Sequence, residues 1–217
     1  MESNQAILQI AELARQINKL HANFSDQWLS QTAAPYNLKS KQINDVFSED
    51  AELKPEFVQY IDDYCDLLFD ELLLNTHYNA LLENYPIRTR IKEPNSRIPK
   101  LYHYKLNKGE GGRVHLKKCL NDLFGFRIFV DDFDHSDANE KHLTDLLQDL
   151  KGIKVHHSSK GDYQATHIYF QNGNNKFFPW ELQIWCNKDE HTNIESHAKH
   201  KQAYTKWPRI YIENHET

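Results

Sequence analysis

Apolar residues in the first third of the chain recur at steps of three and four, which is the spacing of one face of an α-helix. This repeat predicts an amphipathic helix over residues 4–21. A second apolar stripe begins at residue 54 and predicts a helical run to about residue 85, ahead of Pro86. Residues 34–54 lack such a period, and we expect them to be irregular. The apolar positions of the two stripes are Ile7, Ile10, Leu13, Ile17 and Leu20, then Phe57, Val58, Ile61, Cys65, Leu68, Phe69 and Leu72.

Beyond Pro86 the pattern changes to short apolar runs, which are typical of strands mixed with helices. This order of elements predicts an α+β (α/β-like) fold, in which helices flank a mixed β-sheet. Residues 1–85 would form an N-terminal helical extension. We expect strands at 87–91, 126–130, 153–157, 166–170 and 180–185, and helices at 138–150 and 188–206.

Composition is typical of a soluble globular protein. The chain has 217 residues, enough for a core of its own, and 39% of them are hydrophobic. No apolar run approaches the roughly 20 residues that span a bilayer, and the first residues do not resemble a signal peptide. Cys65, Cys119 and Cys186 are odd in number and far apart, which predicts free thiols. We therefore expect a cytoplasmic protein with no membrane partner.

Charge is distributed unevenly in a chain whose net charge is −5. Residues 1–87 carry 5 Lys and Arg against 14 Asp and Glu, a balance of −9. Residues 88–118 carry 10 against 2, a balance of +8, so the remainder holds −4. A local basic block in an acidic protein indicates a specific anionic site. Binding along a nucleic-acid duplex would favour a broader basic surface.

The basic block begins with a spaced set of polar residues. In an extended segment Arg90 and Lys92 lie on one face, because strand side chains repeat every two residues. Pro94 then ends the strand, Ser96 is placed to cap a helix, and Lys100 follows one turn later. This arrangement predicts a cationic cradle for a polyphosphate at a strand-to-helix turn. The alternative is an ordinary solvated basic surface.

Two carboxylates accompany predicted strands. Asp122 precedes a strand in which Gly125 would allow a close backbone approach or a positive φ, although Asp122 alone is typical of a cap or turn. Glu181 and Gln183 alternate inside an apolar strand, which indicates either a cleft floor or a solvent-facing side. Carboxylates from separate strands form a minimal Mg²⁺ site, because this cation prefers oxygen ligands and substrate phosphates.

A turn entering another strand carries Tyr163 and, four residues later, His167. The tyrosine ring could stack on a nucleotide base, and the histidine could hydrogen-bond a phosphate. Both are also common as ordinary surface or core residues. The turn at 108–112 is glycine-rich but contains neither a Walker A motif nor a dinucleotide-binding fingerprint.

Taken in order, these segments resemble the synthetase domain of the RelA/SpoT family of alarmone synthetases. The resemblance covers about residues 86–205, within a synthetase domain expected at 86–217. The pattern Arg-x-Lys-x-x-x-Ser-x-x-x-Lys is matched by Arg90, Lys92, Ser96 and Lys100, and the pattern Asp-x-x-Gly-x-Arg is matched by Asp122, Gly125 and Arg127. The family's acceptor loop is matched by Tyr163 and His167, and its Glu-x-Gln-Ile strand by Glu181, Gln183 and Ile184. A histidine on the following helix is matched by His197.

The resemblance implies a nucleotidyltransferase-like fold and a pyrophosphokinase that moves the β,γ-diphosphate of ATP onto a 3′-hydroxyl. It also implies a role for each matched residue. On the ATP side, Arg90 and Arg127 would sandwich the adenine, and Lys92 and Lys100 would hold the phosphates with help from Ser96. Asp122 would bind Mg²⁺, and Glu181 would lie beside the metal as the base, oriented by Gln183. On the acceptor side, Tyr163 would stack on the base and His167 would contact a phosphate.

Three departures from the family pattern remove positive charge from the acceptor side or add negative charge. Asp162 replaces a glycine, Gln164 a basic residue, and Trp185 an arginine. Because free GDP or GTP carries a 5′-polyphosphate, we expect the acceptor to be the 3′-CCA end of tRNA, with GDP or GTP as the alternative. The protein would then be a translation-inhibiting toxin, with an antitoxin protein as a partner to consider. The acceptor stem could lie on Lys105, Lys108, Arg113, Lys117 and Lys118.

The chain has no His-Asp dipeptide, so the family's hydrolase motif is missing, and its length predicts a stand-alone small synthetase. The oligomeric state stays open, with a homo-oligomer as one option. Other classes of protein remain as alternatives: a nucleotide-binding protein without catalysis, and a helical adaptor that uses its acidic N-terminal half. A metal site is a further alternative, with candidate ligands among His156, His157, His191, His197 and His200.

Overall fold

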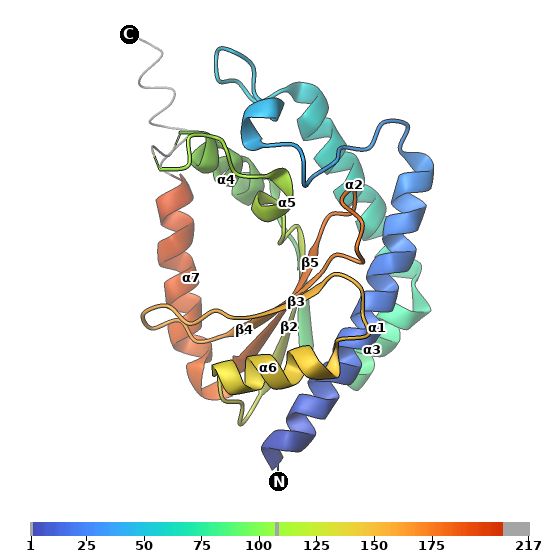
Figure 1. Cartoon of the computed structure of the whole chain (residues 1–217), viewed down its shortest axis with the longest axis vertical. Helices are drawn as coiled ribbons and strands as arrows, with labels where there is room; N and C mark the ends of the chain where they lie inside the picture. Colours follow the sequence, from blue (N-terminus) through green and yellow to red (C-terminus); the bar gives the residue numbers. More distant parts are fainter. Residues whose placement is uncertain (1, 107–108, 206–217) are drawn as a thin grey trace.

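The computed structural model describes residues 2–106 and 109–205, and within these ranges the side chains from 5 to 199. In this part of the chain helices enclose a five-stranded mixed sheet, which confirms the predicted fold class (Figure 1). None of the described helices is both long and apolar enough to cross a membrane. The helices are α1 (Glu2–Gln31), α2 (Pro55–Leu74), α3 (Thr76–Asn84), α4 (Pro94–Leu106), α5 (Leu116–Cys119), α6 (Asp137–Leu146) and α7 (Glu190–Thr205), with 3-10 turns η1 (Ile43–Val46) and η2 (Asn187–Asp189).

The strands lie in the order β1-β2-β5-β4-β3. Among the described strands only the β2–β5 pair is parallel, and the segment between these two strands returns through α6, β3 and β4. In consequence β5 lies at the centre of the sheet, between β2 and β4. The strands are β1 (Ile87–Ile91), β2 (Phe124–Val130), β3 (Ile153–His157), β4 (Thr166–Phe170) and β5 (Trp180–Cys186).

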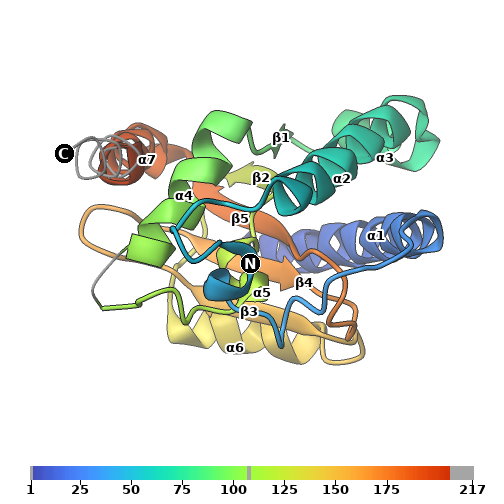
Figure 2. The same cartoon turned by 90° about the horizontal axis from the view of Figure 1, so that it is seen from above.

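One face of the sheet is apolar and forms the core. Trp180 and Leu182 of β5 and Phe124 and Phe126 of β2 are almost fully buried on this face. Helices α1, α2 and α3 cover it, and α6 packs against the edge strand β3 (Figure 2). Alternation along the strands therefore sends the intervening polar residues to the opposite face, beside α7.

The N-terminal helices share one continuous hydrophobic core with the sheet. The Trp180 indole N–H donates to the Tyr64 hydroxyl of α2 at 2.7 Å, in a fully buried position. Phe24 of α1 packs against both rings, with centroids 5.8 Å from Trp180 and 5.3 Å from Tyr64. These contacts fix α1 and α2 against the central strand.

The strand predictions are confirmed to within two residues, but several helix boundaries differ. Helix α1 continues ten residues past the predicted end, to Gln31. The helical run predicted for 54–85 breaks at Asn75, whose side chain accepts the Tyr78 N–H and caps α3. Helix α6 ends at Leu146 instead of position 150, and the short helix α5 was not predicted.

The prediction that Ser96 caps a helix is wrong. Helix α4 begins two residues earlier, at Pro94. Proline is favoured at the first helical position, because its fixed φ suits the helix and its missing N–H would have no intrahelical partner there. The Ser96 hydroxyl instead donates to the Asn95 side chain at 3.2 Å.

We predict that Tyr64→Phe lowers the free energy of unfolding by about 1–3 kcal/mol, because it leaves the buried Trp180 N–H without an acceptor. Urea unfolding measures this change. Tyr85→Phe is the matched control, since the partly exposed Tyr85 hydroxyl receives only a 3.4 Å contact from Gln16; it should change the value by less than about 0.5 kcal/mol. Equal effects of the two substitutions would contradict the prediction.

Candidate active site

An ionic cluster lies where β1, α4 and β2 meet. The Lys92 N–H donates to the Leu123 carbonyl at 2.8 Å, so the β1–β2 pairing continues one residue beyond the strand. This places the Lys92 ammonium group 2.5 Å from Asp122 Oδ2. Lys100, from the second turn of α4, lies 2.9 Å from Asp122 Oδ1. The structure thus joins three of the predicted site residues into one Lys–Asp–Lys cluster.

Electrostatics keep all three groups of the Lys–Asp–Lys cluster charged at neutral pH. Burial alone would raise the pKa of Asp122, but the two ammonium groups outweigh it and hold that pKa well below its usual range. Burial opposes the charge of Lys100, but Asp122 outweighs it and raises the Lys100 pKa. For Lys92 burial dominates and lowers the pKa. The cluster carries a net charge of +1 and is suited to an anion.

A hydrogen-bonded chain runs across β2 and β5 on the polar face of the sheet. Arg127 lies opposite Gln183 in the register, and its Nε and Nη2 donate to Gln183 Oε1 at 3.0 and 2.8 Å. Gln183 Nε2 in turn donates to Glu181 Oε2 at 2.8 Å. Because its oxygen is held by Arg127, the Gln183 amide must present its NH₂ group to Glu181. The cleft-floor interpretation of this strand is therefore the one that the structure supports.

The chain continues into β4. His167 Nδ1 lies 2.8 Å from Glu181 Oε1, and its Nε2 lies 2.9 Å from the Tyr163 hydroxyl. A carboxylate can only accept, so Nδ1 carries the proton toward Glu181. The Tyr169 hydroxyl lies 3.2 Å from the same Nδ1. His167 is thus held on both sides and positions the carboxylate.

Glu181 is only 5% exposed and is nevertheless ionised. Burial would raise its pKa, but the charge and hydrogen bond of His167 and the bond from Gln183 together lower it. The Asp122 charge acts in the opposite direction on the same carboxylate. The two carboxylates are therefore close enough to sense each other, as the sequence predicted for a shared site.

Aromatic rings enclose the Arg127 end of this chain. The guanidinium carbon lies 3.5 Å from the centre of the Trp185 ring, which occupies one face of the Arg127 plane. His197 of α7 stacks on Trp185, with ring centroids 5.5 Å apart. Burial lowers the Arg127 pKa to about 10 and the His197 pKa to about 4. At neutral pH Arg127 is charged and His197 is neutral.

Gly125 leaves space between two of the predicted site residues. In the register it lies between Arg90 of β1 and Glu181 of β5. A Cβ at this position would lie 4.0 Å from Glu181 Oε2, at ordinary contact distance, and Gly125 does not have a positive φ. A longer side chain would project between the two residues, so the glycine keeps this part of the polar face open.

Three predicted positions are placed differently from expectation. Tyr163 is 9% exposed, and its ring makes T-shaped contacts with Trp185 and His197, so little of the ring is open for stacking on a base. Ser96 bonds to Asn95 and not to the Lys–Asp–Lys cluster. Lys117 donates to the Asn174 carbonyl at 2.9 Å, which ties its amine to a loop.

The other basic residues considered for tRNA binding differ in how far their side chains are available to a ligand. Arg113 and Lys118 are exposed, and Lys105 donates to Asn44 at 2.8 Å. Lys108 lies outside the described residues, as does the His200 side chain among the histidines considered as metal ligands.

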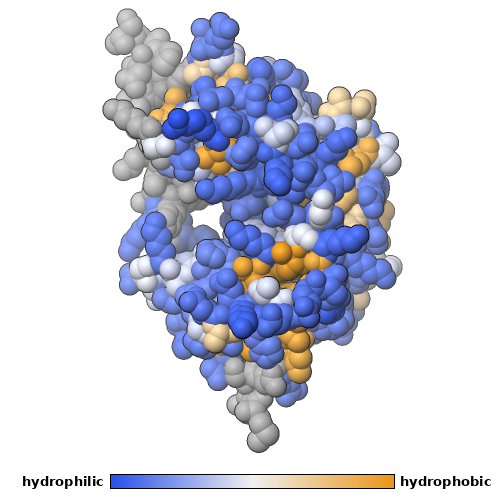
Figure 3. Space-filling model, viewed as in Figure 1, coloured by the Kyte–Doolittle hydropathy of each residue, from blue (hydrophilic) through white to orange (hydrophobic). Residues whose placement is uncertain are grey.

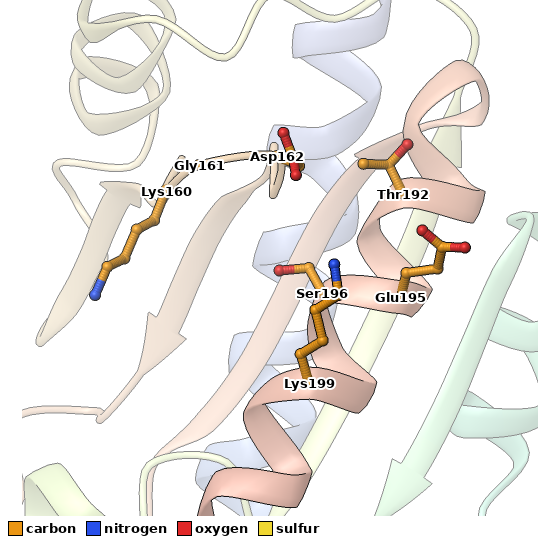
Figure 4. Close-up of a pocket in the computed structure, with 7 residues that line it drawn as sticks. All are labelled: Lys160, Gly161, Asp162, Thr192, Glu195, Ser196 and Lys199. Atoms are coloured by element: carbon orange, nitrogen blue, oxygen red, sulfur yellow. The ribbon is translucent and has the colours of Figure 1, made fainter.

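A cavity of about 490 Å³ separates the turn before β4 from α7 (Figure 4). The molecular surface is hollowed beside α7 in Figure 3. Lys160 and Asp162 line one side, and Lys199 and Glu195 face them from the helix. Two positive and two negative side chains give this cavity no net charge.

Sequence reasoning missed two features of the site. Tyr169 contacts His167 but lies in an apolar strand, and only its position two residues after the histidine indicates that it shares the same face. Trp185 was read as the loss of a cation, whereas it supports Arg127 through its ring. The Arg127–Trp185 contact joins two strands that are distant in sequence, so no local pattern indicates it.

The carboxylates fit a magnesium ion. They are hard oxygen donors of the kind Mg²⁺ prefers. Lys92 and Lys100 each occupy one oxygen of Asp122, and His167 and Gln183 each occupy one of Glu181. A carboxylate has about four acceptor sites, so each of the two groups keeps acceptor capacity for a cation. The magnesium role stays a prediction.

No protein-family model and no curated protein matches the chain. It is similar to two solved structures of small alarmone synthetase 1 from Bacillus subtilis. One is bound to its product pppGpp (14% identity, 75% of this chain and 90% of that chain, TM-score 0.34), and the other has 14% identity over 74% of this chain and 93% of that chain, with a TM-score of 0.37. It is also similar to a Streptococcus mutans protein (15%, 73% and 83%, TM-score 0.36). Likeness at this level carries no conclusion about chemistry, which rests on the chain's own residues.

We predict that Asp122→Asn lowers the free energy of unfolding at neutral pH by on the order of 3 kcal/mol, because two buried ammonium groups lose their counter-charge. Since the folded-state pKa of Asp122 is depressed, this contribution is complete above about pH 3.9 and is lost as the pH falls through the folded-state value. Urea unfolding of both proteins should give equal differences at neutral pH and about pH 5, and a smaller one at about pH 3.

The control for this comparison is Asp26→Asn, an exposed position of α1 that should change stability by less than about 0.5 kcal/mol. A difference that persists unchanged into acid would contradict the assignment of a depressed pKa to Asp122.

Proposed function

We propose that this protein is an ATP-dependent pyrophosphokinase that transfers the β,γ-diphosphate of ATP to a 3′-hydroxyl. The observation that carries the proposal is the position of the Lys–Asp–Lys cluster near a buried carboxylate, Glu181, whose two oxygens are oriented by His167 and Gln183. Phosphoryl-type transfer needs chiefly positioning and charge neutralisation, and this site has groups for both. The resemblance of the motifs to RelA/SpoT synthetases supplies the reaction type.

The cluster suggests how the triphosphate is held. Lys92 and Lys100 have Asp122 as their partner when no nucleotide is bound. An incoming triphosphate would take over part of the hydrogen-bonding capacity of both ammonium groups, each of which has three donors. The site is thereby kept charged and ordered before binding, so less reorganisation is needed at the moment of reaction.

Asp122 and Glu181 would hold Mg²⁺, which supplies neutralisation of the phosphate charge when it is bound. Arg127 keeps one face of its guanidinium plane on Trp185 and leaves the other for the adenine, with Arg90 of β1 as the second layer. Glu181 would accept the proton of the attacking 3′-hydroxyl. His167 and Gln183 fix the orientation of this carboxylate, which serves the role because a general base must first lie within hydrogen-bonding reach of the proton that it accepts.

For the acceptor we propose the 3′ end of tRNA, which would make the protein a translation-inhibiting toxin of the cytoplasm. The cavity beside α7 supports this choice, since Asp162 and Glu195 cancel the charges of Lys160 and Lys199. A 3′-terminal adenosine brings only diester phosphates and needs less positive charge than a free nucleotide. Tyr163 would stack on that adenine after His197 uncovers its ring.

GDP or GTP is the second candidate acceptor. The observation that favours it is the presence of two ammonium groups, Lys160 and Lys199, on opposite sides of the same cavity (Figure 4). A 5′-polyphosphate placed between them would contact both.

The test of the reaction uses ATP labelled at the γ-phosphate with Mg²⁺ and deacylated tRNA, GDP or GTP. We expect label on the acceptor together with an equal amount of AMP. Glu181→Gln should lower the rate by about 10²–10⁴-fold, because it removes the proton acceptor, and should raise the Mg²⁺ concentration that the reaction needs, because it also removes one carboxylate of the proposed metal site. Glu83→Gln, an exposed carboxylate of α3, is the control and should have no effect. Label transfer at the normal rate in Glu181→Gln would overturn the assigned role, and no transfer to any acceptor would overturn the proposed function.

Asp162→Asn tests the acceptor assignment. Removing this negative charge from the cavity should lower KM for GDP and GTP about fivefold, as expected for one partly screened charge a few ångströms from a phosphate. Transfer to tRNA should change little. The control is Asp70→Asn, exposed on α2. Efficient use of GDP or GTP by the unaltered protein, with tRNA left unlabelled, would refute the tRNA assignment and support the second candidate.

A further inference from the structure

A second group of ligand-type side chains lies at the far end of β5. His135 comes from the loop after β2, Cys186 is the last residue of β5, and Asp189 ends the turn η2 that follows. One ligand atom from each residue lies within 4.8 Å of the other two. Cys186 is five residues from Glu181, about 17 Å along an extended strand, so this group is separate from the candidate active site.

The distance between the histidine and the cysteine matches that of a tetrahedral metal centre. His135 Nε2 lies 3.6 Å from Cys186 Sγ. A tetrahedral Zn²⁺ with bonds of about 2.05 Å to nitrogen and about 2.3 Å to sulfur separates these two ligand atoms by about 3.6 Å. The pair is therefore already at the spacing that coordination requires. Asp189 is half-buried, and one of its carboxylate oxygens lies within 4.8 Å of both atoms.

The surrounding residues orient the histidine as they do in metal sites. His135 Nδ1 lies 3.0 Å from the Thr166 hydroxyl of β4, which gives the ring a partner on the side away from Cys186. When Nδ1–H donates to Thr166, the Nε2 lone pair points toward the cysteine.

The three ligand types also select the metal. Imidazole nitrogen and thiolate sulfur favour zinc and related transition metals, whereas Mg²⁺ prefers oxygen donors alone. The Cys186 thiol now donates to the Phe133 carbonyl at 3.0 Å. Metal binding would release this proton to solvent and form the metal–sulfur bond in its place.

We propose that His135, Cys186 and Asp189 form a binding site for one zinc-type divalent transition-metal ion. A surface cavity of about 290 Å³ lies beside this group, lined by Asp132, Asp134, Gln164 and Lys188 together with His135 and Asp189, and it would admit water or a further oxygen ligand to the ion. The ion would join the loop after β2 to the turn that leads into α7. It would thereby fix the start of the helix that carries His197.

The test uses the purified full-length protein with Co²⁺ as a spectroscopic probe. We expect one equivalent to bind with the thiolate-to-cobalt charge-transfer band and the visible d–d bands of a tetrahedral complex, and Zn²⁺ to displace it. Cys186→Ser and Asp189→Asn should abolish or strongly weaken this signal. Thr166→Val, which keeps the shape but removes the hydroxyl bonded to His135, should lower the affinity about 10–100-fold.

Cys119→Ser is the matched control, because Cys119 is as fully buried as Cys186 and lies outside this group. It should leave the cobalt spectrum unchanged even if it lowers stability. Asp189→Asn guards against a folding defect, since Asp189 is not in the core. Cobalt binding without a thiolate band, or a band that survives in Cys186→Ser and Asp189→Asn, would overturn the proposal. The proposed transferase activity is read separately, by label transfer, so either inference can fail alone.

Discussion

The parallel pairing of β2 with β5 is the constraint on which the candidate active site and the group at the end of β5 both depend. Its register sets Gly125 opposite Glu181 and Arg127 opposite Gln183, and it ends with Val130 opposite Cys186. Parallel strands require a long crossover, and here α6, β3 and β4 supply it. The crossover also places β4, with His167, next to β5 on the side away from β2. Glu181 therefore has one hydrogen-bonding partner from its own strand, Gln183, and one from β4, His167. A shift of one residue would turn every polar residue of β5 into the core.

Burying so many charged groups is possible because each has a partner. Asp122 is held by two lysines, Glu181 by His167 and Gln183, and Arg97, 4% exposed, by Asp62 and Cys65 of α2. Removing one partner of such a pair is costly, whereas an intact pair contributes little net stability. Stability therefore comes chiefly from the apolar face and the N-terminal helices. The polar face is free to be organised for binding.

Strand positions and most predicted site residues could be read from the sequence, because alternation and motif spacing are local properties. The break between α2 and α3 could not be predicted, because the period of the apolar stripe continues across Asn75, where the helix ends. The start of α4 was misplaced because Ser96 suits a cap by type, while Pro94 already suits the first turn. The covering of Tyr163 and the meeting of His135 with Cys186 arise from tertiary packing between segments far apart in the chain. No local pattern encodes them.

Helix α7 connects the turn that carries Tyr163 with the end of β5. Asn193 exchanges hydrogen bonds with the backbone of Gln164 at 2.9 and 2.8 Å and so holds the turn that carries Tyr163. One turn later, His197 covers the Tyr163 and Trp185 rings. Any acceptor base that stacks on Tyr163 must therefore displace part of α7, and the affinity for it is reduced by the free energy of that displacement. An ion at Cys186 and Asp189 would fix the start of the helix and increase that cost, so occupancy of the metal site would weaken acceptor binding.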